Sequence, residues 1–424
     1  MNKNNTLIWQ LKRDLLNFAE KLSDGLTRPK MKFLAQMLYG LLVSQSILLT
    51  KIGRALQEET TLKKTEDRLS RNLNAFMPVT GCVHQNYLEI ARPHVDDDTI
   101  FCIDPGDITK KYSRHQEGLD WIRDGSDHKI AKGWYLYEVT ALTHGKKLPI
   151  PVYTRLVSPE DPMSDGETEQ IIEAIRATQQ AFGVVGTITI DKGADTAAIY
   201  EHCLDTKQRF IIRSKVTRHL MIGDEILETS EIAKTMKGKF RIDYTNKYGK
   251  KSRLRVSFKT VRLPSRPDVP LSLVMVYGYD SEPMLLLTNL NIIGKNTCLR
   301  VVKTYLCRWR IEEYYRFKKN QFKLENIRVL SLDSICALVF LLSVLSGWIA
   351  MFANKRGDSM LLEEVFVRAK RVYDIPQFTL YAVADGIYDI LKFAARGIRF
   401  ALLRPPQSQQ LSLFMPSAFN LSAA

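Results

Sequence analysis

The sequence predicts an α/β (α+β) fold, in which a mixed sheet with flanking helices follows a helical domain and is interrupted by a β-rich insertion. Three observations predict this fold. Residues 1–95 carry apolar side chains at helical spacing, as in Leu11 and Leu15. Beyond them the pattern changes to strand-forming runs bounded by Gly and Pro. Residues 215–285 are again rich in strand formers, such as the segment KFRIDYTNKYGKKSRLRVSFKTVRLP.

The order of elements after residue 98 identifies the sheet. Three strands are expected first, in DTIFCIDPGDI, GWYLYEVTALTHG and KLPIPVYTRLVS, and being consecutive they favour an antiparallel meander. A helix, a strand, a helix and a strand are expected next, at Glu167–Phe182, Gly186–Asp191, Thr196–Leu204 and Arg209–Arg213. This order resembles that of an RNase H-like fold, in which a further helix would follow the insertion.

The length of 424 residues is enough to bury a large core and suggests two or three domains. The expected parts are a helical N-terminal domain over 1–95, the first part of the core over 96–214, the basic insertion over 215–285, the second part of the core over 286–353, and a helical C-terminal tail over 354–424. The final segment, QSQQLSLFMPSAFNLSAA, is expected to be frayed.

The composition limits the partners and the compartment. A formal net charge of +15 predicts a polyanionic partner, although charge alone does not separate nucleic acid from a membrane surface. The six cysteines include no CxxC pair and no His at zinc-ligand spacing, so we expect reduced thiols. The first residues, MNKNNTLIWQLKRDLLNFAEKL, are too polar for a secretory signal, which favours the cytoplasm.

One segment raises the alternative of a membrane protein. Ile335–Ala353 is 19 residues long and carries no charge, so it could span a bilayer. It also contains two Ser and one Gly, follows Asp333, and is alone in an otherwise charged chain. We therefore predict a buried core helix that packs against the sheet, and no membrane.

The region Arg300–Arg328 is strongly basic, with nine Lys or Arg against three Glu and no Gly or Pro. Taken as one helix, it places Tyr305, Arg308, Glu312 and Lys319 on a single face. A carboxylate among cations and a phenol suits a group that holds a metal beside phosphates. The alternative is a solvated basic helix face.

Two aspartates upstream are candidates for the same site. Asp104 closes the apolar strand TIFCID, and Asp191 closes the apolar strand GTITID. A carboxylate at the end of a buried strand is costly unless a cation or solvent meets it, which makes both candidate metal ligands. Taken alone, either one is more simply an ordinary turn residue.

The spacing of Tyr305, Arg308, Glu312 and Lys319 matches a known signature. Tyr, two residues, Arg, three residues, Glu, six residues and Lys is the YREK motif of the insertion-sequence-four family of bacterial DDE transposases, which this chain resembles over roughly residues 99–350. The resemblance implies an RNase H-like catalytic core. It also implies that Asp104 and Asp191, in the correct chain order before Glu312, complete the acidic set.

The resemblance assigns roles to these residues. Asp104, Asp191 and Glu312 would be the catalytic residues and would hold two Mg²⁺ or Mn²⁺ ions, because such ions prefer oxygen ligands. Glu313, the neighbour of Glu312, is the alternative third ligand. The remaining motif residues would grip phosphates at the transposon end, with Arg316 on the same face expected to join them; these residues are Tyr305, Arg308 and Lys319.

The function implied is cut-and-paste DNA transposition: metal-dependent strand cleavage at terminal inverted repeats, then transfer of the 3′-hydroxyl to target DNA. Double-stranded DNA would be the partner, a homodimer would assemble on it, and the protein would act in the bacterial cytoplasm, associated with the nucleoid. The N-terminal helices would read the repeats, although a basic helical bundle is also an ordinary capping domain. The alternatives are an RNase H-like nuclease or resolvase, and a non-catalytic transposase-derived DNA-binding protein.

Basic residues also collect around the start and middle of the insertion. Residues 207–266 hold 17 Lys or Arg against five Asp or Glu. Alternation in RLRVSFKTVRL puts the basic residues on one face, as a phosphate-binding sheet requires, although a solvated outer face is the alternative. We expect backbone phosphates to bind at Lys250, Lys251 and Arg253, next to a hairpin turn at Lys247–Lys250.

In this insertion a Tyr, rather than a Trp, would stack on a base. Some relatives hold a flipped base with a Trp there, but this chain has no Trp between Trp134 and Trp309. The aromatic residues that could stack on a base are Tyr244, Tyr248 and Tyr279.

Overall fold

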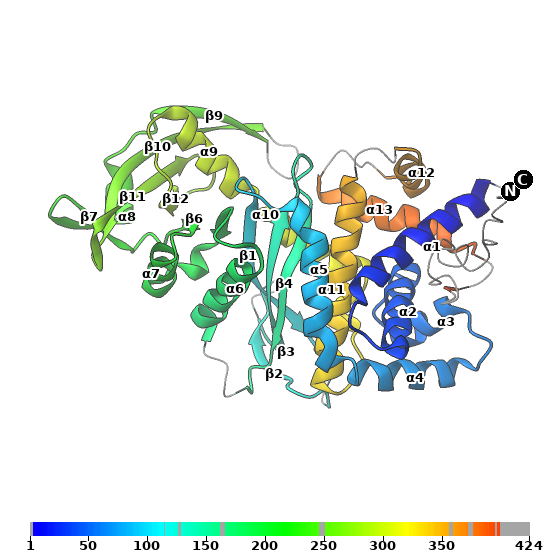
Figure 1. Cartoon of the computed structure of the whole chain (residues 1–424). Helices are drawn as coiled ribbons and strands as arrows, with labels where there is room; N and C mark the ends of the chain where they lie inside the picture. The colour runs from blue at the N-terminus through cyan, green and yellow to red at the C-terminus, as the bar shows by residue number, and fades with distance from the viewer. Residues whose placement is uncertain are drawn as a thin grey trace, which may run out of the picture.

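The computed structural model describes residues 3–113, 115–125, 129–161, 166–245, 251–355, 359–371, 376–394 and 397–398. The chain forms a central sheet with a helical layer on one side, and a β-rich lobe lies at the far edge of the sheet (Figure 1). The predicted α/β class with an RNase H-like mixed sheet is confirmed.

The core sheet is built from the predicted strands. They are β1 (Ile100–Thr109), β3 (Ile130–Leu142), β4 (Pro149–Val157), β5 (Thr187–Ile190) and β6 (Arg209–Arg213). Strand β1 lies between β3, which is antiparallel to it, and β5, which is parallel, and β6 is parallel to β5. An additional short strand, β2 (Asp120–Arg123), pairs with the first residues of β3. The helices α6 (Gly166–Phe182) and α7 (Ala197–Asp205) lead into β5 and β6.

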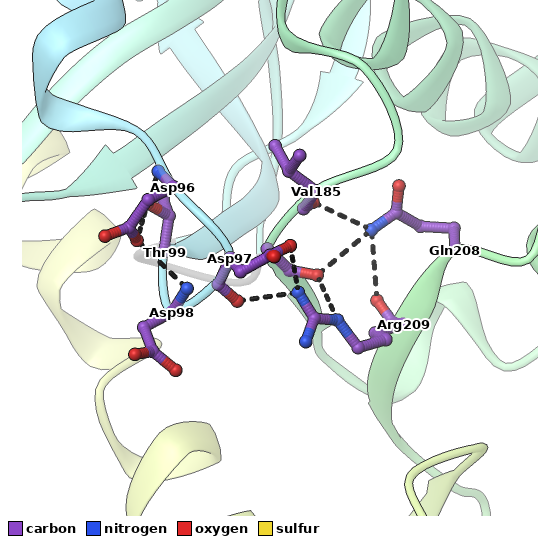
Figure 2. A network of polar contacts seen from close by, with 8 residues as sticks. Asp96, Asp97, Asp98, Thr99, Val185, Gln208 and Arg209 are labelled. Carbon is purple, nitrogen blue, oxygen red and sulfur yellow. Dashed lines mark hydrogen bonds and ion pairs between the residues drawn. The ribbon is translucent and has the colours of Figure 1, made fainter.

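The starts of the three parallel strands are tied together by polar contacts, which Figure 2 shows. The Arg209 guanidinium donates to the backbone carbonyl of Asp97 at 2.6 Å and to its carboxylate at 3.0 Å, and also to the Gly186 carbonyl at 3.1 Å. The Gln208 amide donates to the Val185 carbonyl at 3.2 Å. These contacts fix the register of β1, β5 and β6, and therefore the point at which β1 and β5 part.

The N-terminal region is helical, as predicted. Its helices are α1 (Lys3–Leu22), α2 (Arg28–Ser44), α3 (Leu49–Leu56), α4 (Leu62–Asn74) and α5 (Thr80–Ala91), followed by a short 3₁₀ turn at Arg92–His94. Their apolar side chains belong to the same hydrophobic core as the sheet, since Leu11, Leu38, Ile103 and Leu342 are members of one cluster. The six cysteines are free thiols, as expected.

The long apolar segment forms α11 (Leu332–Asn354), which packs between β4 and the N-terminal helices (Figure 1). It is long and apolar enough to cross a membrane, but 89% of its most apolar window is buried inside the protein. Burial on all sides explains why nearly all of its residues are apolar, as expected of a core helix. The C-terminal helices α12 (Ser359–Ala369) and α13 (Pro376–Leu391) follow it, and the QSQQLSLFMPSAFNLSAA segment lies outside the described residues.

The insertion is β-rich, as predicted, and it extends the core sheet. Its elements are β7 (His219–Ile222), β8 (Glu225–Glu228), α8 (Thr229–Lys234), β9 (Phe240–Thr245), β10 (Lys251–Leu263) and β11 (Arg266–Tyr277), and β12 (Met284–Thr288) leads back to the core. Strand β12 pairs with β6, so the order continues as β6-β12-β11-β10 into the lobe. The core and the insertion therefore share one continuous sheet.

The prediction of a single helix over Arg300–Arg328 is wrong. The segment forms α9 (Lys295–Leu306) and α10 (Trp309–Gln321), with a break at Cys307–Arg308, and a 3₁₀ turn follows at Leu324–Asn326. Helix α9 packs on the sheet of the insertion, in a second hydrophobic cluster, whereas α10 packs on the core sheet. The chain changes direction between these two layers, so tertiary packing overrides helix propensity.

Candidate active site

Asp104 and Asp191 lie side by side where two parallel strands part. The pairing of β1 with β5 ends at Ile103 and Ile190. Asp104 is the next residue of β1, and Asp191 directly follows the last residue of β5. Burial of the preceding strand residues delivers both carboxylates to the same point of the sheet. The sequence pattern of an apolar strand followed by Asp therefore indicated the correct neighbours.

The prediction that Asp104 closes its strand is wrong. Strand β1 continues to Thr109, with Asp104 opposite Glu138 and Pro105 opposite Tyr137 of β3. The Pro is tolerated because β5 has already ended, so no neighbour on that edge requires its missing N–H. Asp104 is thus held by the middle of a strand.

The break between α9 and α10 brings Arg308 to the carboxylates. The guanidinium donates to Glu312 Oε1 at 2.6 Å and to Asp104 Oδ1 at 3.3 Å. The Tyr305 hydroxyl, at the end of α9, donates to Asp191 Oδ1 at 3.1 Å. The structure thus brings together five of the predicted site residues, from β1, β5, α9 and α10, although they do not share one continuous helix face.

Burial and charge shift the protonation of these groups in opposite directions. Burial raises the pKa of Asp104 to about 7, because Glu312 and Asp191 add to the effect of burial while Arg308 only partly opposes it. Burial also raises the pKa of Asp191, but the charge of Arg308 and other contacts outweigh it, so the net pKa is lowered. Burial lowers the pKa of Arg308, and the neighbouring carboxylates raise it by more. Arg308 therefore stays charged among the acids.

Lys319 and Arg316 are also engaged with carboxylates. Lys319 Nζ lies 2.9 Å from Asp107 and 3.0 Å from Glu325, on the side of α10 next to the site. Arg316 is half exposed and pairs with Glu313 at 2.5 Å. Glu313 therefore binds Arg316, whereas Glu312 binds Arg308. The side chain of Glu313 is also more buried than the side chain of Glu312.

A cleft of about 1020 Å³ begins at the carboxylates and runs along α10. Acidic and basic side chains both line it, and Asp107, Asp124 and Glu325 belong to its wall as well. The residues that matter here are Asp104, Glu312, Lys319, Lys110, Lys111 and Arg328. The basic side chains of the wall are donors that phosphate oxygens can accept from, and Asp104 and Glu312 lie in the same cleft.

The carboxylate oxygen atoms of the site are of the type that binds divalent cations. Asp104 and Glu312 already converge on one positive group, the guanidinium of Arg308, and all three acidic side chains offer the oxygen atoms that Mg²⁺ and Mn²⁺ prefer. Within the part of the chain that the structure describes, no three His, Cys, Asp or Glu side chains are placed closely enough to form a metal cage as they stand. Asp104, Asp191 and Glu312 would be the residues that hold the metal.

The predicted phosphate-binding residues of the insertion lie far along the sheet from this site, on β10. Lys251 and Arg253 are exposed, and Arg253 pairs with Asp243 of β9 at 3.0 Å. Lys250, Tyr248 and the predicted turn at Lys247–Lys250 lie outside the described residues. The rings of Tyr244 and Tyr279 lie 5.6 Å apart, and Tyr279 is 41% exposed.

Sequence reasoning missed several residues that surround the site. The Tyr315 hydroxyl donates to the backbone carbonyl of Asp104 at 2.6 Å, and its ring packs on Gly106, where a Cβ atom would lie only 3.0 Å away. Glu167, at the start of α6, adds to the charge that raises the pKa of Asp104. Glu138 of β3 and Lys318 of α10 form a buried ion pair between the helix and the sheet. The sequence contained one indication of this pair, because Lys318 is a charged residue on the otherwise apolar face of α10.

The fold and the site define an RNase H-like protein whose acidic side chains cluster beside cations. Residues 96–346 match the sequence model of the family described as the transposase DDE domain, and the chain belongs to this family. The match contains Asp104, Asp191 and all four residues of the predicted YREK motif. Among solved structures, the cryo-EM structure of the piggyBac transposase synaptic complex with hairpin DNA is similar, with a TM-score of 0.45 and 11% identity, over 98% of this chain and 86% of that chain.

Proposed function

We propose that this transposase catalyses cut-and-paste transposition of an insertion sequence of the insertion-sequence-four family. The observation that carries the proposal is that Asp104 and Glu312 meet at Arg308, with Asp191 next to the end of the β1–β5 pairing and bound by Tyr305, inside the region that matches the transposase DDE domain. The reaction would cleave DNA strands at the terminal inverted repeats and transfer the freed 3′-hydroxyl to target DNA.

The three carboxylates would hold two Mg²⁺ or Mn²⁺ ions, which would activate the attacking water or 3′-hydroxyl and stabilise the leaving oxygen. The residues of the chain provide the placement. Asp104 is fixed by its strand and by the Tyr315 hydroxyl on its carbonyl. Glu312 is placed by α10, and Asp191 is oriented by Tyr305.

Tyr305, Arg308 and Lys319 have a second role in this proposal. Tyr305 and Arg308 donate to Asp191 and Glu312, and Lys319 donates to Asp107 in the adjoining cleft. Phosphate oxygens can also accept from each of these donors. Arg316, half exposed at the cleft, would join them. A phosphate placed beside the carboxylates would therefore meet donors that are already oriented, with Arg308 offering a planar, bidentate group.

The insertion supplies the wider DNA-binding surface. Arg255 of β10 lies directly opposite Arg241 of β9, and both are exposed. Like charges at such a position repel one another. In the described residues neither guanidinium forms an ion pair with a carboxylate. Together with Lys251, they offer an unneutralised basic strip to backbone phosphates.

The N-terminal helices would bind the terminal repeats in this transposase. Exposed cations on α3 and α4, such as Arg54 and Lys64, could bind phosphates of the terminal repeats. Arg68 instead forms an ion pair with Glu58. Bringing two transposon ends together requires a homodimer at least when DNA is bound. The protein would act in the cytoplasm of a bacterium, on its nucleoid, without a membrane.

The decisive experiment is a strand-transfer assay. The full-length protein, a labelled duplex that carries one transposon end, a supercoiled target plasmid and Mg²⁺ or Mn²⁺ are incubated together. Covalent joining of the 3′-end to the plasmid is expected. Hydrolysis without joining would instead support an RNase H-like nuclease or resolvase, and binding without cleavage would support a non-catalytic DNA-binding protein.

A further inference from the structure

A completely buried ion pair joins the active-site helix α10 to the core sheet. Lys318 Nζ of α10 is 2.5 Å from Glu138 Oε2 of β3, and both side chains have no exposed surface. Lys318 stands on the face of α10 that packs on the core, together with Ile311 and Tyr314, whereas Glu312 stands on the face that borders the cleft.

The pair is the centre of a fully connected polar network. Glu138 Oε1 accepts hydrogen bonds from Thr154 of β4 at 2.8 Å, Ser343 of α11 at 2.9 Å and Tyr314 of α10 at 3.1 Å. Lys318 also donates to Ser343 at 3.3 Å and lies 4.7 Å from the centre of the Tyr314 ring. Four elements therefore meet at one charge pair, and each of them contributes a polar group.

Stability is a poor reason for such a pair. Removing two charges from water costs about as much as their attraction returns, so apolar residues of similar volume usually hold a core at least as well. What the pair does impose is a single placement. If α10 shifted along the sheet or rotated, Lys318 and Glu138 would be left buried and unpaired, which is far more costly than an apolar mismatch.

The placement that the pair selects is that of the site. Glu138 is the cross-strand partner of Asp104, and Lys318 lies on the same helix as Glu312. Tyr315, which follows Tyr314 on α10, donates a hydrogen bond to the backbone carbonyl of Asp104 and so links the helix directly to this strand. One end of the pair is thus anchored to the strand that flanks Asp104, and the other to the helix that presents Glu312.

We propose that the Glu138–Lys318 pair is a positioning device that fixes α10 on the sheet and thereby sets Glu312 against Asp104. The inference rests on the proposed function, in which these two carboxylates share a metal site. Neither Glu138 nor Lys318 touches the cleft, so both are positioning residues rather than catalytic ones.

The test separates positioning from stability. In the Glu138→Leu/Lys318→Met double variant the charges are replaced by apolar side chains, and Tyr314→Phe is added because the Tyr314 hydroxyl would otherwise be buried without its acceptor. Thermal unfolding of this protein is expected at or above the temperature of the wild type. Mn²⁺ affinity, measured by titration calorimetry, is expected to fall about tenfold or more, as when outer partners of metal ligands are removed. Cleavage at saturating DNA should fall with it, while DNA affinity stays unchanged. A stable variant that binds Mn²⁺ and cleaves as the wild type does would overturn the proposal.

A milder matched pair covers the case in which this variant does not fold. Ser343→Ala removes hydrogen bonds to both Glu138 and Lys318, whereas Ser346→Ala, on the same helix and equally buried, removes only a bond to the Leu342 carbonyl. Ser343→Ala alone should weaken Mn²⁺ binding. Equal effects of the two substitutions would refute the positioning role.

A third readout keeps this inference separate from the proposed function. Hydrogen exchange of the α10 backbone amides needs neither metal nor DNA, and it should accelerate in Ser343→Ala but not in Ser346→Ala. If the wild type binds no Mn²⁺ or cleaves no DNA, the proposed function fails, and the exchange comparison still decides whether the pair positions α10. If the wild type is active and exchange is unchanged, the positioning role fails alone.

Discussion

Arg308 and Glu312 are joined by a 2.6 Å hydrogen bond, and the same guanidinium reaches Asp104 at 3.3 Å. One cation therefore holds two carboxylates that come from different elements, a strand and a helix. The compensation is incomplete, because burial still raises the pKa of Asp104 to about 7. A buried carboxyl group with a strongly raised pKa reduces the stability of the fold, and such groups are typical of functional sites.

This cost predicts a pH-dependent gain in stability from Asp104→Asn. The folded protein holds the Asp104 proton with a pKa of about 7, against an ordinary value of 3.8. Ionisation therefore opposes folding, and stability is lost as the pH rises from about 4 to about 7. Asp104→Asn should stabilise the metal-free protein near pH 8, by at most about 4 kcal/mol at about 1.4 kcal/mol per tenfold change in proton affinity, and by little near pH 4.

Denaturant unfolding at the two pH values measures this effect. Asp224→Asn is a suitable control, because Asp224 is exposed in the turn between β7 and β8. Equal stabilisation by Asp104→Asn at both pH values would mean that its carboxylate does not carry the cost.

The basic strip of the insertion predicts a change in salt dependence. Replacing Arg241, Lys251 and Arg255, the three residues of this strip, with Ala should weaken DNA binding irrespective of sequence. It should also reduce the slope of log affinity against log salt by up to about 0.9 for each phosphate that the variant no longer neutralises. Binding titrations at several salt concentrations measure the slope. Arg266→Ala is the matched control, because Arg266 lies on the adjacent strand and is already paired with Asp205 at 2.6 Å. An unchanged slope in the triple variant would exclude phosphate binding there.

The burial of α11 predicts how the protein fractionates. A core helix covered by β4 and the N-terminal helices has no face left for lipid. The protein should therefore be recovered in the soluble or DNA-bound fraction after lysis and should be absent from washed membranes. Extraction that depends on detergent would contradict the placement of α11 in the core.

The sequence was sufficient for the main outline of the fold and for the identity of the central residues. Strand β6 has the predicted bounds, Arg209–Arg213, because a short apolar run between polar turns has few alternatives. Asp191 was placed at the end of β5 for the same reason. The YREK spacing selected Arg308 and Glu312, which the structure brings together with Asp104.

Features that depend on tertiary packing could not be predicted. The DPG segment at Asp104 reads as a turn, but pairing with β3 keeps it extended. The break at Cys307–Arg308 has no Gly or Pro to mark it, because it arises from packing on two different layers. Lys318 was identifiable as a charge on an apolar helix face, but its partner Glu138 is 180 residues away in the sequence.

Removing the charge of Glu312 should abolish cleavage but preserve binding. Glu312→Gln keeps the size and hydrogen-bonding capacity of the side chain and loses the charge that a divalent cation needs. Strand cleavage in Mg²⁺ should fall to background, while the affinity for transposon-end DNA, measured by gel shift, changes by less than about threefold. Glu313→Gln is the control, because Glu313 pairs with Arg316. If Glu313→Gln alone abolishes cleavage, Glu313 is the third ligand.

Removing Arg308 should give a phenotype of a different kind. Arg308→Ala leaves Asp104, Asp191 and Glu312 in place but deletes a bidentate phosphate partner, so assembly of the end complex should weaken, with cleavage partly recovered at high protein concentration. It also removes the charge that opposes the high pKa of Asp104, so the residual activity should require a higher pH than the wild type does. Cleavage rates measured across pH and protein concentration separate the two effects. If Arg308→Ala and Glu312→Gln merely lose similar amounts of DNA affinity, this face is a binding surface only, and the proposed mechanism is wrong.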